Sequence, residues 1–127
     1  MRLRGLDHAE IEAALRDLAA QGWQDDQRFA ESYAAGRAAR GCGPLRIVAE
    51  LEERGVTASE AQAALQTVGG NWDELAAAAL HRRFGSGPVA DLSDRARRMR
   101  FLQRRGFSQA QSTRALSSAE PNDAEQR

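Results

Sequence analysis

The chain has 127 residues, and its 18 basic and 18 acidic residues give a formal net charge of zero. Its single cysteine, Cys42, excludes an internal disulfide, and no apolar run approaches the roughly 20 residues that cross a bilayer. Alanine, leucine, arginine and glutamate dominate, whereas runs of valine, isoleucine and threonine are absent. This composition predicts an all-α protein. Because the first residues lack the apolar stretch of a signal peptide, we expect a cytoplasmic protein with no membrane partner.

The N-terminal part of the chain predicts helices over residues 9–21, 26–40 and 44–54. Gly22 is expected to end the first helix, and Asp25 and Asp26 to cap the second. Cys42 stands between two glycines before the third helix and is expected to be an exposed turn thiol. Apolar side chains recur at helical spacing and predict one inward face on each helix. The residues expected to face inward are Ile11, Leu15, Leu18, Phe29, Ala30, Tyr33, Leu45, Ile47, Val48 and Leu51.

The C-terminal part predicts helices over residues 59–68, 72–84, 93–105 and 108–116. The segment Gly85-Ser86-Gly87-Pro88 repeats the earlier Gly41-Cys42-Gly43-Pro44, in which glycine and proline interrupt one helix and start the next. The connection that follows is longer in the second copy, so Val89 to Asp91 either adds a loop or lengthens the next helix. Residues 117–127 are polar and are expected to be disordered.

An Arg-Gly-apolar phrase occurs three times, with its glycine at Gly5, Gly55 and Gly106. Glycine suits the left-handed position that ends a helix, and the apolar residue after it can fold back onto the last turn. A capping residue follows each copy, with Glu or Gln three residues beyond it, which predicts three capping boxes. The predicted pairs are Asp7 with Glu10, Thr57 with Glu60, and Ser108 with Gln111. Each phrase therefore ends one helix and leads into another.

The glycines of this phrase are spaced 50 and 51 residues apart, which is long enough for three helices. The fold class predicted from this period is an all-α array of tandem three-helix repeats. The array is expected to be elongated and curved, with each unit packed against its neighbours. The expected segments are residues 1–54 for a first repeat running into the second, 55–105 for the next repeat, 106–116 for the start of the last, and 117–127 for the tail.

The charges are distributed unevenly along the chain. Residues 1–81 carry 8 arginines against 13 acids, whereas residues 82–114 carry 9 arginines against 2 acids. A concentrated basic face can bind a polyanion or an acidic protein groove, although such faces are often merely solvated. Three of the arginines follow i, i+3, i+7 spacing and share one helix face. The candidate partner- or DNA-binding residues are Arg82, Arg83, Arg97, Arg98, Arg100, Arg104 and Arg105.

The sequence contains no visible catalytic constellation. His8 and His81 stand far apart, and adjacent residues such as Glu52 and Glu53 point in different directions on a helix. The segment from Gly41 to Pro44 lacks the Lys and Ser or Thr of a nucleotide cradle, and no partners at ligand spacing surround the cysteine. We therefore expect a protein that is not an enzyme, with no catalytic residues, no cofactor and no metal.

Several short motifs, taken in order, resemble one protein family. They are Asp25-Asp26-Gln27-Arg28-Phe29-Ala30, Gly41-Cys42-Gly43-Pro44-Leu45-Arg46-Ile47, Glu50-Leu51, Arg54-Gly55-Val56 and Phe101-Leu102-Gln103-Arg104-Arg105-Gly106-Phe107. With this order and spacing the chain resembles the RecX family over roughly residues 1–116. The family is known for tandem three-helix repeats. Its members normally have a further helical stretch before the first Arg-Gly turn, so the first repeat here is expected to lack its N-terminal part.

The resemblance implies a non-enzymatic protein that docks in the helical groove of the RecA–DNA filament. Such a protein would negatively modulate the ATPase, recombinase and coprotease activities of RecA in DNA repair and the SOS response. Two other hypotheses stay open. One is a direct single- or double-stranded DNA-binding module that uses Arg97, Arg100 and Arg104, and the other is a passive helical adaptor for another acidic protein.

Overall fold

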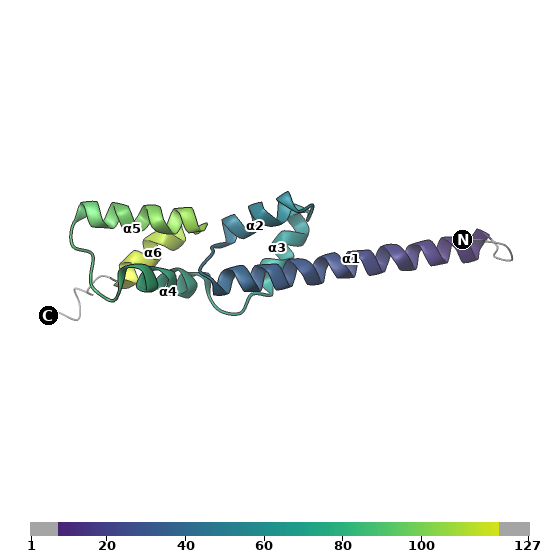
Figure 1. Cartoon of the computed structure of the whole chain (residues 1–127), viewed down its shortest axis with the longest axis horizontal. Helices are drawn as coiled ribbons and strands as arrows, with labels where there is room; N and C mark the ends of the chain where they lie inside the picture. The colour runs from purple at the N-terminus through teal and green to yellow at the C-terminus, as the bar shows by residue number, and fades with distance from the viewer. Residues whose placement is uncertain (1–7, 120–127) are drawn as a thin grey trace.

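A computed structural model describes residues 8–119, which form six α-helices and no strands (Figure 1). The helices are α1 (His8–Ala39), α2 (Pro44–Glu53), α3 (Ala58–Gln66), α4 (Trp72–Phe84), α5 (Leu92–Arg105) and α6 (Gln109–Ala119). The all-α prediction is confirmed. The predicted turn at Gly5, the cap at Asp7 and the tail beyond Ala119 lie outside the described residues.

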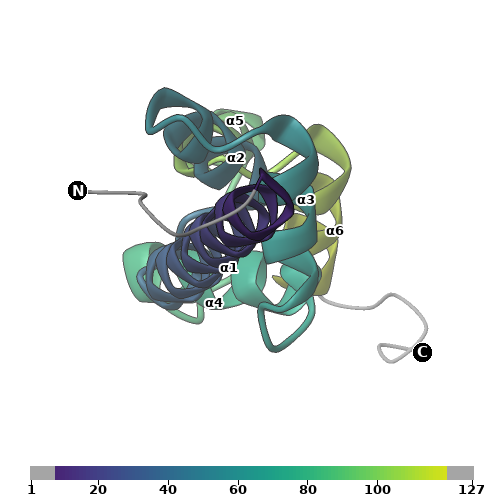
Figure 2. The same ribbon diagram turned by 90° about the vertical axis from the view of Figure 1, so that its right-hand side faces the viewer.

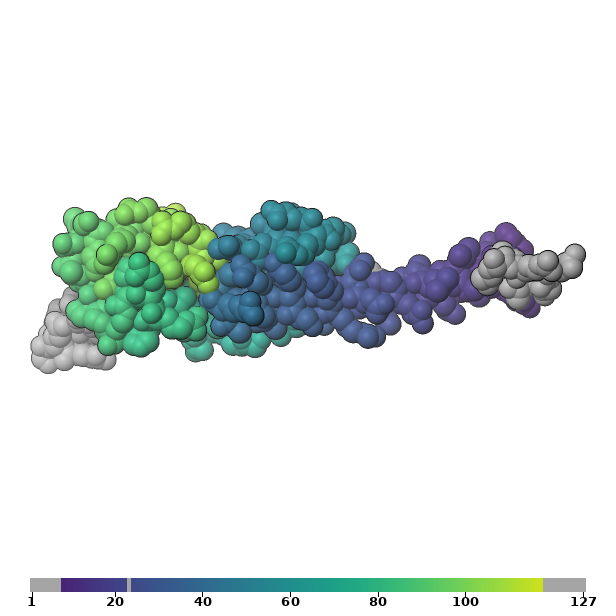
Figure 3. Space-filling model, in the orientation of Figure 1, coloured from purple at the N-terminus to yellow at the C-terminus, as the bar shows by residue number. Residues whose placement is uncertain are grey.

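The helices pack as two groups of three, with α1, α2 and α3 in one and α4, α5 and α6 in the other. Each group has its own core, the first around Ile47 and Leu51 and the second around Leu102, Phe107 and Leu116. Figures 1 and 3 show the groups following one another along an elongated molecule, with α1 extending beyond them, and Figure 2 views the molecule from the end at which α1 projects. In the chain, the described Arg-Gly turns at Gly55 and Gly106 fall between the second and third helices of each group, and the Gly106 turn also contacts the start of α2 in the other group.

The predicted helix break at Gly22 is wrong, because α1 runs without interruption through this residue. A glycine in a helix interior costs about 1 kcal/mol relative to alanine, but unlike proline it keeps its backbone hydrogen bond. Asp25 and Asp26 are therefore not caps, and both lie exposed within α1. Trp23 is also within this helix, but its side chain is outside the described set.

The first half of α1 does not bury the face that its apolar spacing predicted. Leu15 and Leu18 are 59% and 64% exposed, and Ile11 is half-buried. No other described element packs against this half, which Figure 1 shows as a single projecting helix. Helical periodicity identified the face correctly as apolar, but burial needs a second surface, and residues 8–119 supply none there.

Three further burial predictions are wrong. Cys42 is fully buried, because Gly41 takes a φ of 90° that turns the chain inward and places the cysteine in the first core. Leu45 is 60% exposed, on the first turn of α2, and Phe29 is 46% exposed. The ring of Phe29 packs instead against the half-buried Tyr33, at 5.7 Å between centroids.

The predicted helix ends agree well with the structure. Gly55 and Gly106 have φ of 87° and 103°, as expected for left-handed ends. The Ser108–Gln111 capping box forms in both directions, since the Gln111 N–H donates to Ser108 Oγ at 3.1 Å and the Ser108 N–H donates to Gln111 Oε1 at 2.9 Å. At Thr57 the cap hydrogen bond forms, since the Glu60 N–H donates to Thr57 Oγ1 at 3.1 Å, but Glu60 Oε1 accepts from the Thr57 hydroxyl at 2.9 Å instead of from its backbone N–H.

The two connections left open by the sequence are also resolved. The segment from Val89 to Asp91 forms a loop and does not lengthen α5, whose N-cap is Asp91. At the end of the described region, α6 continues to Ala119, so Ser117 is helical and not part of a disordered tail.

Glu50 of α2 fastens α2 to α1. Its carboxylate accepts hydrogen bonds from Arg37 Nε (2.9 Å), Tyr33 Oη (3.0 Å) and Arg46 Nε (3.2 Å). Partial burial by itself would raise the pKa of Glu50, but these donors outweigh burial and hold the pKa below its usual range. Burial and the neighbouring carboxylate raise the pKa of Tyr33. Arg54 closes this cluster by lying 4.7 Å from the centre of the Tyr33 ring.

The two groups meet where the end of α5 reaches the start of α2. The Gly43 N–H donates to the Arg105 carbonyl at 2.7 Å, and the Leu45 N–H donates to the Gly106 carbonyl at 3.0 Å. Pro44, between them, has no N–H to satisfy. Unpaired N–H groups at the start of α2 are thereby satisfied by unpaired carbonyls at the end of α5. We call this contact, formed by residues 43–45 and 105–106, the seam.

Gly43 and Gly106 allow the two backbone segments of the seam to approach each other closely. A Cβ on Gly43 would lie 2.4 Å from the Phe107 nitrogen, and a Cβ on Gly106 would lie 2.3 Å from the Arg46 Cβ. Gly43 itself has φ of −86°, which any residue adopts. Its requirement for glycine is therefore entirely steric.

We predict that Gly43→Ala lowers the free energy of unfolding by about 1 to 3 kcal/mol, the usual penalty for overpacking a closed contact. Gly87→Ala is the matched control, because Gly87 occupies the equivalent position of the second group and has nothing within 4 Å of its Cβ position. Urea unfolding followed by circular dichroism measures both variants. Equal stability of the two would contradict the steric role of the seam.

Candidate polyanion-binding surface

The exposed face of α5 carries the arginines predicted from helical spacing. Arg100 and Arg104 are exposed, and their side chains make no hydrogen bond or ion pair within the described residues. Arg97 lies on the same face but is partly neutralised, since its Nη2 lies 2.9 Å from Asp94 Oδ1. The face therefore presents two uncompensated guanidinium groups and a third that shares an acid.

Three of the predicted arginines gather around one aromatic ring. The guanidinium carbons of Arg83, Arg97 and Arg98 lie 5.0, 5.2 and 5.1 Å from the centre of the Phe84 ring. Each distance is within the range of a cation–π interaction. Phe101 meets Phe84 edge to face at 5.5 Å. This packing holds the end of α4 against α5 and fixes where the arginines stand.

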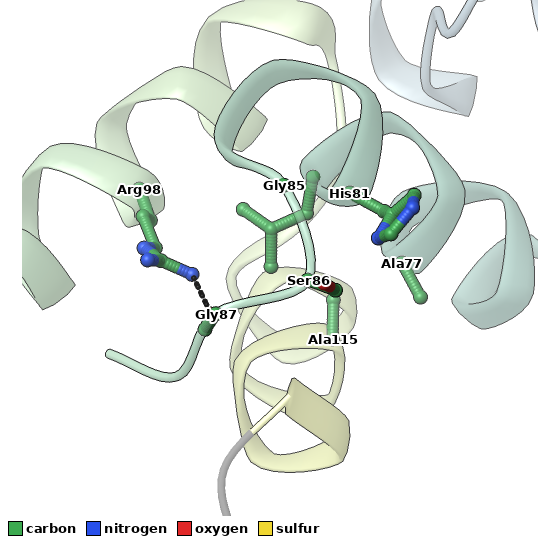
Figure 4. Close-up of a pocket in the computed structure, with 8 residues that line it drawn as sticks. Ala77, His81, Gly85, Ser86, Gly87, Arg98 and Ala115 are labelled. Carbon is green, nitrogen blue, oxygen red and sulfur yellow. Dashed lines mark hydrogen bonds between the residues drawn. The ribbon is translucent and has the colours of Figure 1, made fainter. Parts of the chain in front are cut away.

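Arg98 is a structural residue and not part of an exposed binding face. It is 6% exposed, and its Nη1 donates to the Gly87 carbonyl at 3.2 Å, while its Nη2 donates to the Pro88 carbonyl at 3.3 Å. Its Nε pairs with Asp94 Oδ2 at 3.1 Å. The guanidinium thereby ties the loop between α4 and α5 to the α5 helix (Figure 4).

Asp94 is the acid that organises this loop. Its carboxylate accepts the Ala90 N–H at 3.0 Å and pairs with Arg97 and Arg98, while its own N–H donates to Asp91 Oδ1. The hydrogen bond from Ala90 and those from the two arginines lower the pKa of Asp94 to about 2. The carboxylate therefore stays ionised throughout the physiological range.

A cavity of about 270 Å³ lies beneath the same loop, between α4, α5 and α6. Figure 4 shows His81, Ser86 and Ala115 around it, with Arg98 donating to Gly87 at its edge. Its other walls are alanine, leucine and glycine. Of the predicted arginines only Arg98 lines it, so this cavity lies apart from the basic face.

A second pocket, of about 190 Å³, opens beside the seam. Four of its lining residues are arginines, and none is acidic. Arg105 donates through Nε to the Gly41 carbonyl at 3.1 Å, and through Nη2 to the Arg40 carbonyl. Arg82 also reaches Gly41, because its Nη2 lies 2.9 Å from the position of a Cβ there. The lining residues are Arg40, Gly41, Ala79, Arg82, Arg83, Phe101 and Arg105, which together we call the seam pocket.

The seven predicted arginines are thus divided among four environments. Arg100 and Arg104, with Arg97, form the outer face of α5, whereas the other four serve in the loop, the ring cluster or the seam pocket. Sequence reasoning missed Arg40, which joins the seam pocket from the end of α1. Its place immediately before the Gly41 turn was the available signal, because basic residues favour helix C-termini.

Two other kinds of site receive no support in the described region. Among residues 8–119, no group of three His, Cys, Asp or Glu side chains could hold a metal ion. Nor is any helix of this region long and apolar enough to span a membrane.

The fold and these surfaces define a tandem three-helix repeat protein with a basic seam. Residues 25–65 match the second three-helix domain of RecX, and residues 72–116 match its third. The chain belongs to the RecX family. The second match covers almost all of α4, α5 and α6, whereas the first covers the second half of α1 with α2 and most of α3.

Several relatives carry the name regulatory protein RecX. The protein of Xanthomonas campestris pv. campestris (strain B100) is 42% identical over 107 residues, which are 84% of this chain and 66% of that protein. The protein of Xanthomonas oryzae pv. oryzae (strain MAFF 311018) is 41% identical over 118 residues, 93% of this chain and 73% of that one. The Halorhodospira halophila protein is 39% identical over 120 residues, with 94% and 74% covered. The chain thus spans about two thirds to three quarters of its relatives' length.

We predict that Asp94→Asn loosens the loop before α5 and lowers stability at pH 5. Asp94 has a pKa of about 2 in the folded protein, below the value near 3.9 of an unfolded aspartate. Its contribution is therefore present above about pH 4 and disappears as the pH falls toward 2. Urea midpoints at pH 5 and pH 2 should show a gap between variant and wild type that closes on acidification.

Glu52→Gln is the control for this measurement, since Glu52 is exposed on α2 and forms no ion pair with a described residue. It should leave the midpoint unchanged at both pH values. A gap for Asp94→Asn that persists at pH 2 would contradict the role of its ionised form.

Proposed function

We propose that this protein is a regulator of RecA that binds the RecA–DNA filament and lowers its ATPase, recombinase and coprotease activities. The observation that carries the proposal is membership of the RecX family over both packed groups. The proposed partner is the filament, the proposed setting is DNA repair and the SOS response in the cytoplasm, and the action is regulatory and not enzymatic. The naming of the relatives as regulatory proteins supports this assignment.

The shape and charge of the molecule support a docking role. The two groups of helices form an elongated body (Figure 3). The outer face of α5 presents Arg100 and Arg104, whose side chains have no acidic partner among the described residues. Electrostatic complementarity of this kind accelerates association and fixes the register of a complex. An elongated body with one basic face is suited to a groove that winds along a nucleoprotein filament.

We predict that the purified protein slows DNA-dependent ATP hydrolysis by RecA, and that Arg100→Glu combined with Arg104→Glu weakens this effect. The half-maximal concentration should rise roughly tenfold, which corresponds to about 1.4 kcal/mol. A coupled ATPase assay over a titration of each protein gives the comparison. Hydrolysis that stays unchanged over a wide titration of the wild type would overturn the proposed function.

The matched control is Arg16→Glu combined with Arg28→Glu, which changes the net charge equally at exposed positions of α1. Its half-maximal concentration should stay close to that of the wild type. Thermal unfolding of each variant verifies that the reversed charges leave the fold intact. Equal losses for both pairs would show that net charge, and not the α5 face, governs the effect.

Direct binding to single- or double-stranded DNA is the second candidate function. The observation that favours it is the seam pocket, where four arginines meet without an acid. The two functions are compatible, because a protein in the groove of a RecA–DNA filament lies close to DNA.

A further inference from the structure

The seam pocket brings four arginines together. The Nη2 atoms of Arg82 and Arg105 both lie within 3.2 Å of one point, the Cβ position of Gly41. Two guanidinium groups are therefore close neighbours, and Arg40 and Arg83 also line the pocket. Among the described residues, no acidic side chain lines the pocket, so like charges are brought together without a counter-charge from these walls.

Helix ends account for only part of this charge. The arginines stand in or just after the last turns of α1, α4 and α5, where partial negative charge collects. Each helix end supplies about half a unit of negative charge, so three ends offset roughly one and a half of four positive charges. A surplus of roughly two and a half charges remains. Neutralisation of the helix ends is thus an incomplete explanation of the cluster.

The four arginines of the seam pocket differ in how far their side chains are engaged in contacts within the protein. Arg105 is committed to the fold, because it donates to the Gly41 and Arg40 carbonyls across the seam. Arg83 lies over the Phe84 ring. The side chains of Arg40 and Arg82 are exposed and donate no hydrogen bond within residues 8–119. Their donors remain available to an anion that enters the pocket.

The surroundings favour a polymer of phosphates over a single carboxylate. Arg97, Arg100 and Arg104 follow one face of α5, and this face adjoins the strip that carries Phe101 and Arg105 into the pocket. Positive charge therefore continues from the pocket along the helix, as a repeating anion requires. Phe101 gives the pocket an apolar wall against which a sugar can lie. Arginine clusters beside aromatic rings are typical of surfaces that track a single-stranded backbone.

We propose that the seam pocket holds one backbone phosphate of DNA, with Arg40 and Arg82 as its principal donors and Arg105 as a fixed positive charge behind them. The outer face of α5 carries the neighbouring phosphates. Contacts of this kind position a nucleic acid without reading its sequence. The inference deepens the proposed function, since a regulator anchored in this way holds the DNA of the filament as well as its protein.

The test uses the full chain and a short fluorescently labelled single-stranded oligonucleotide, with no RecA present. Arg40→Gln combined with Arg82→Gln should weaken binding roughly fivefold to tenfold, equally for oligonucleotides of different sequence. The slope of log K against log salt should fall in magnitude by about 0.7, the contribution of one phosphate on a single strand. Neither side chain supports the fold through a described hydrogen bond, so thermal unfolding should match the wild type.

Arg16→Gln combined with Arg28→Gln is the control, because it removes the same charge from exposed positions on α1. Its affinity and salt slope should match those of the wild type. Equal losses for both pairs, or none for the pocket pair, would overturn the proposal. The proposal would also be overturned if the variant with Arg40→Gln and Arg82→Gln bound DNA normally but inhibited RecA poorly, since the pocket would then bind an acidic group of RecA.

The two proposals fail in distinguishable ways. A wild-type protein that slows RecA but binds no oligonucleotide refutes the phosphate site and leaves the regulatory function standing. A protein that binds DNA through the pocket but leaves RecA hydrolysis unchanged refutes the regulatory function alone.

Discussion

At the seam, two N–H groups that begin α2 donate to two carbonyls at the end of α5, and these hydrogen bonds fix how the two groups of helices are joined. The donors are Gly43 and Leu45, and the acceptors are Arg105 and Gly106. Helix ends carry unsatisfied backbone groups, so joining a start to an end satisfies both without side chains. The approach is so close that neither glycine has room for a Cβ. The seam thereby joins the two groups of helices, each with its own small core, into one elongated molecule.

The same constraint explains where the positive charge collects. Because the end of α5 is pressed against the turn after α1, Arg105 reaches the Arg40 and Gly41 carbonyls, and Arg82 from α4 reaches the same turn. Arginines that are distant in sequence thus line one pocket. In the second group, the corresponding Gly87 is open, and its loop is held by Arg98 and Asp94 instead. The repeated Gly-X-Gly-Pro segment therefore has a different structural role in each group.

Much of the fold was predictable because it rests on local chemistry. Glycine at a left-handed helix end and a Thr or Ser cap with Glu or Gln three residues later need only neighbouring residues, and Gly55, Gly106 and Thr57 behave as expected. The failures have equally definite causes. Gly22 is a weak helix breaker without proline, so α1 continues through it. Leu15 lies on an apolar face that no described element covers, and Leu45 sits at the seam end of its helix.

The all-α class, the position of most helix ends, the repeat period and the concentration of arginine after residue 81 could all be read from the amino-acid sequence. These features follow from interactions within a few residues or from composition. Which arginines are available for binding depends on how the helices pack. The side chains of Arg98 and Arg105 donate hydrogen bonds to backbone carbonyls, whereas those of Arg40 and Arg82 donate none within the described residues. A helical pattern gives the direction of a side chain, but its partners come from segments that only packing brings into reach.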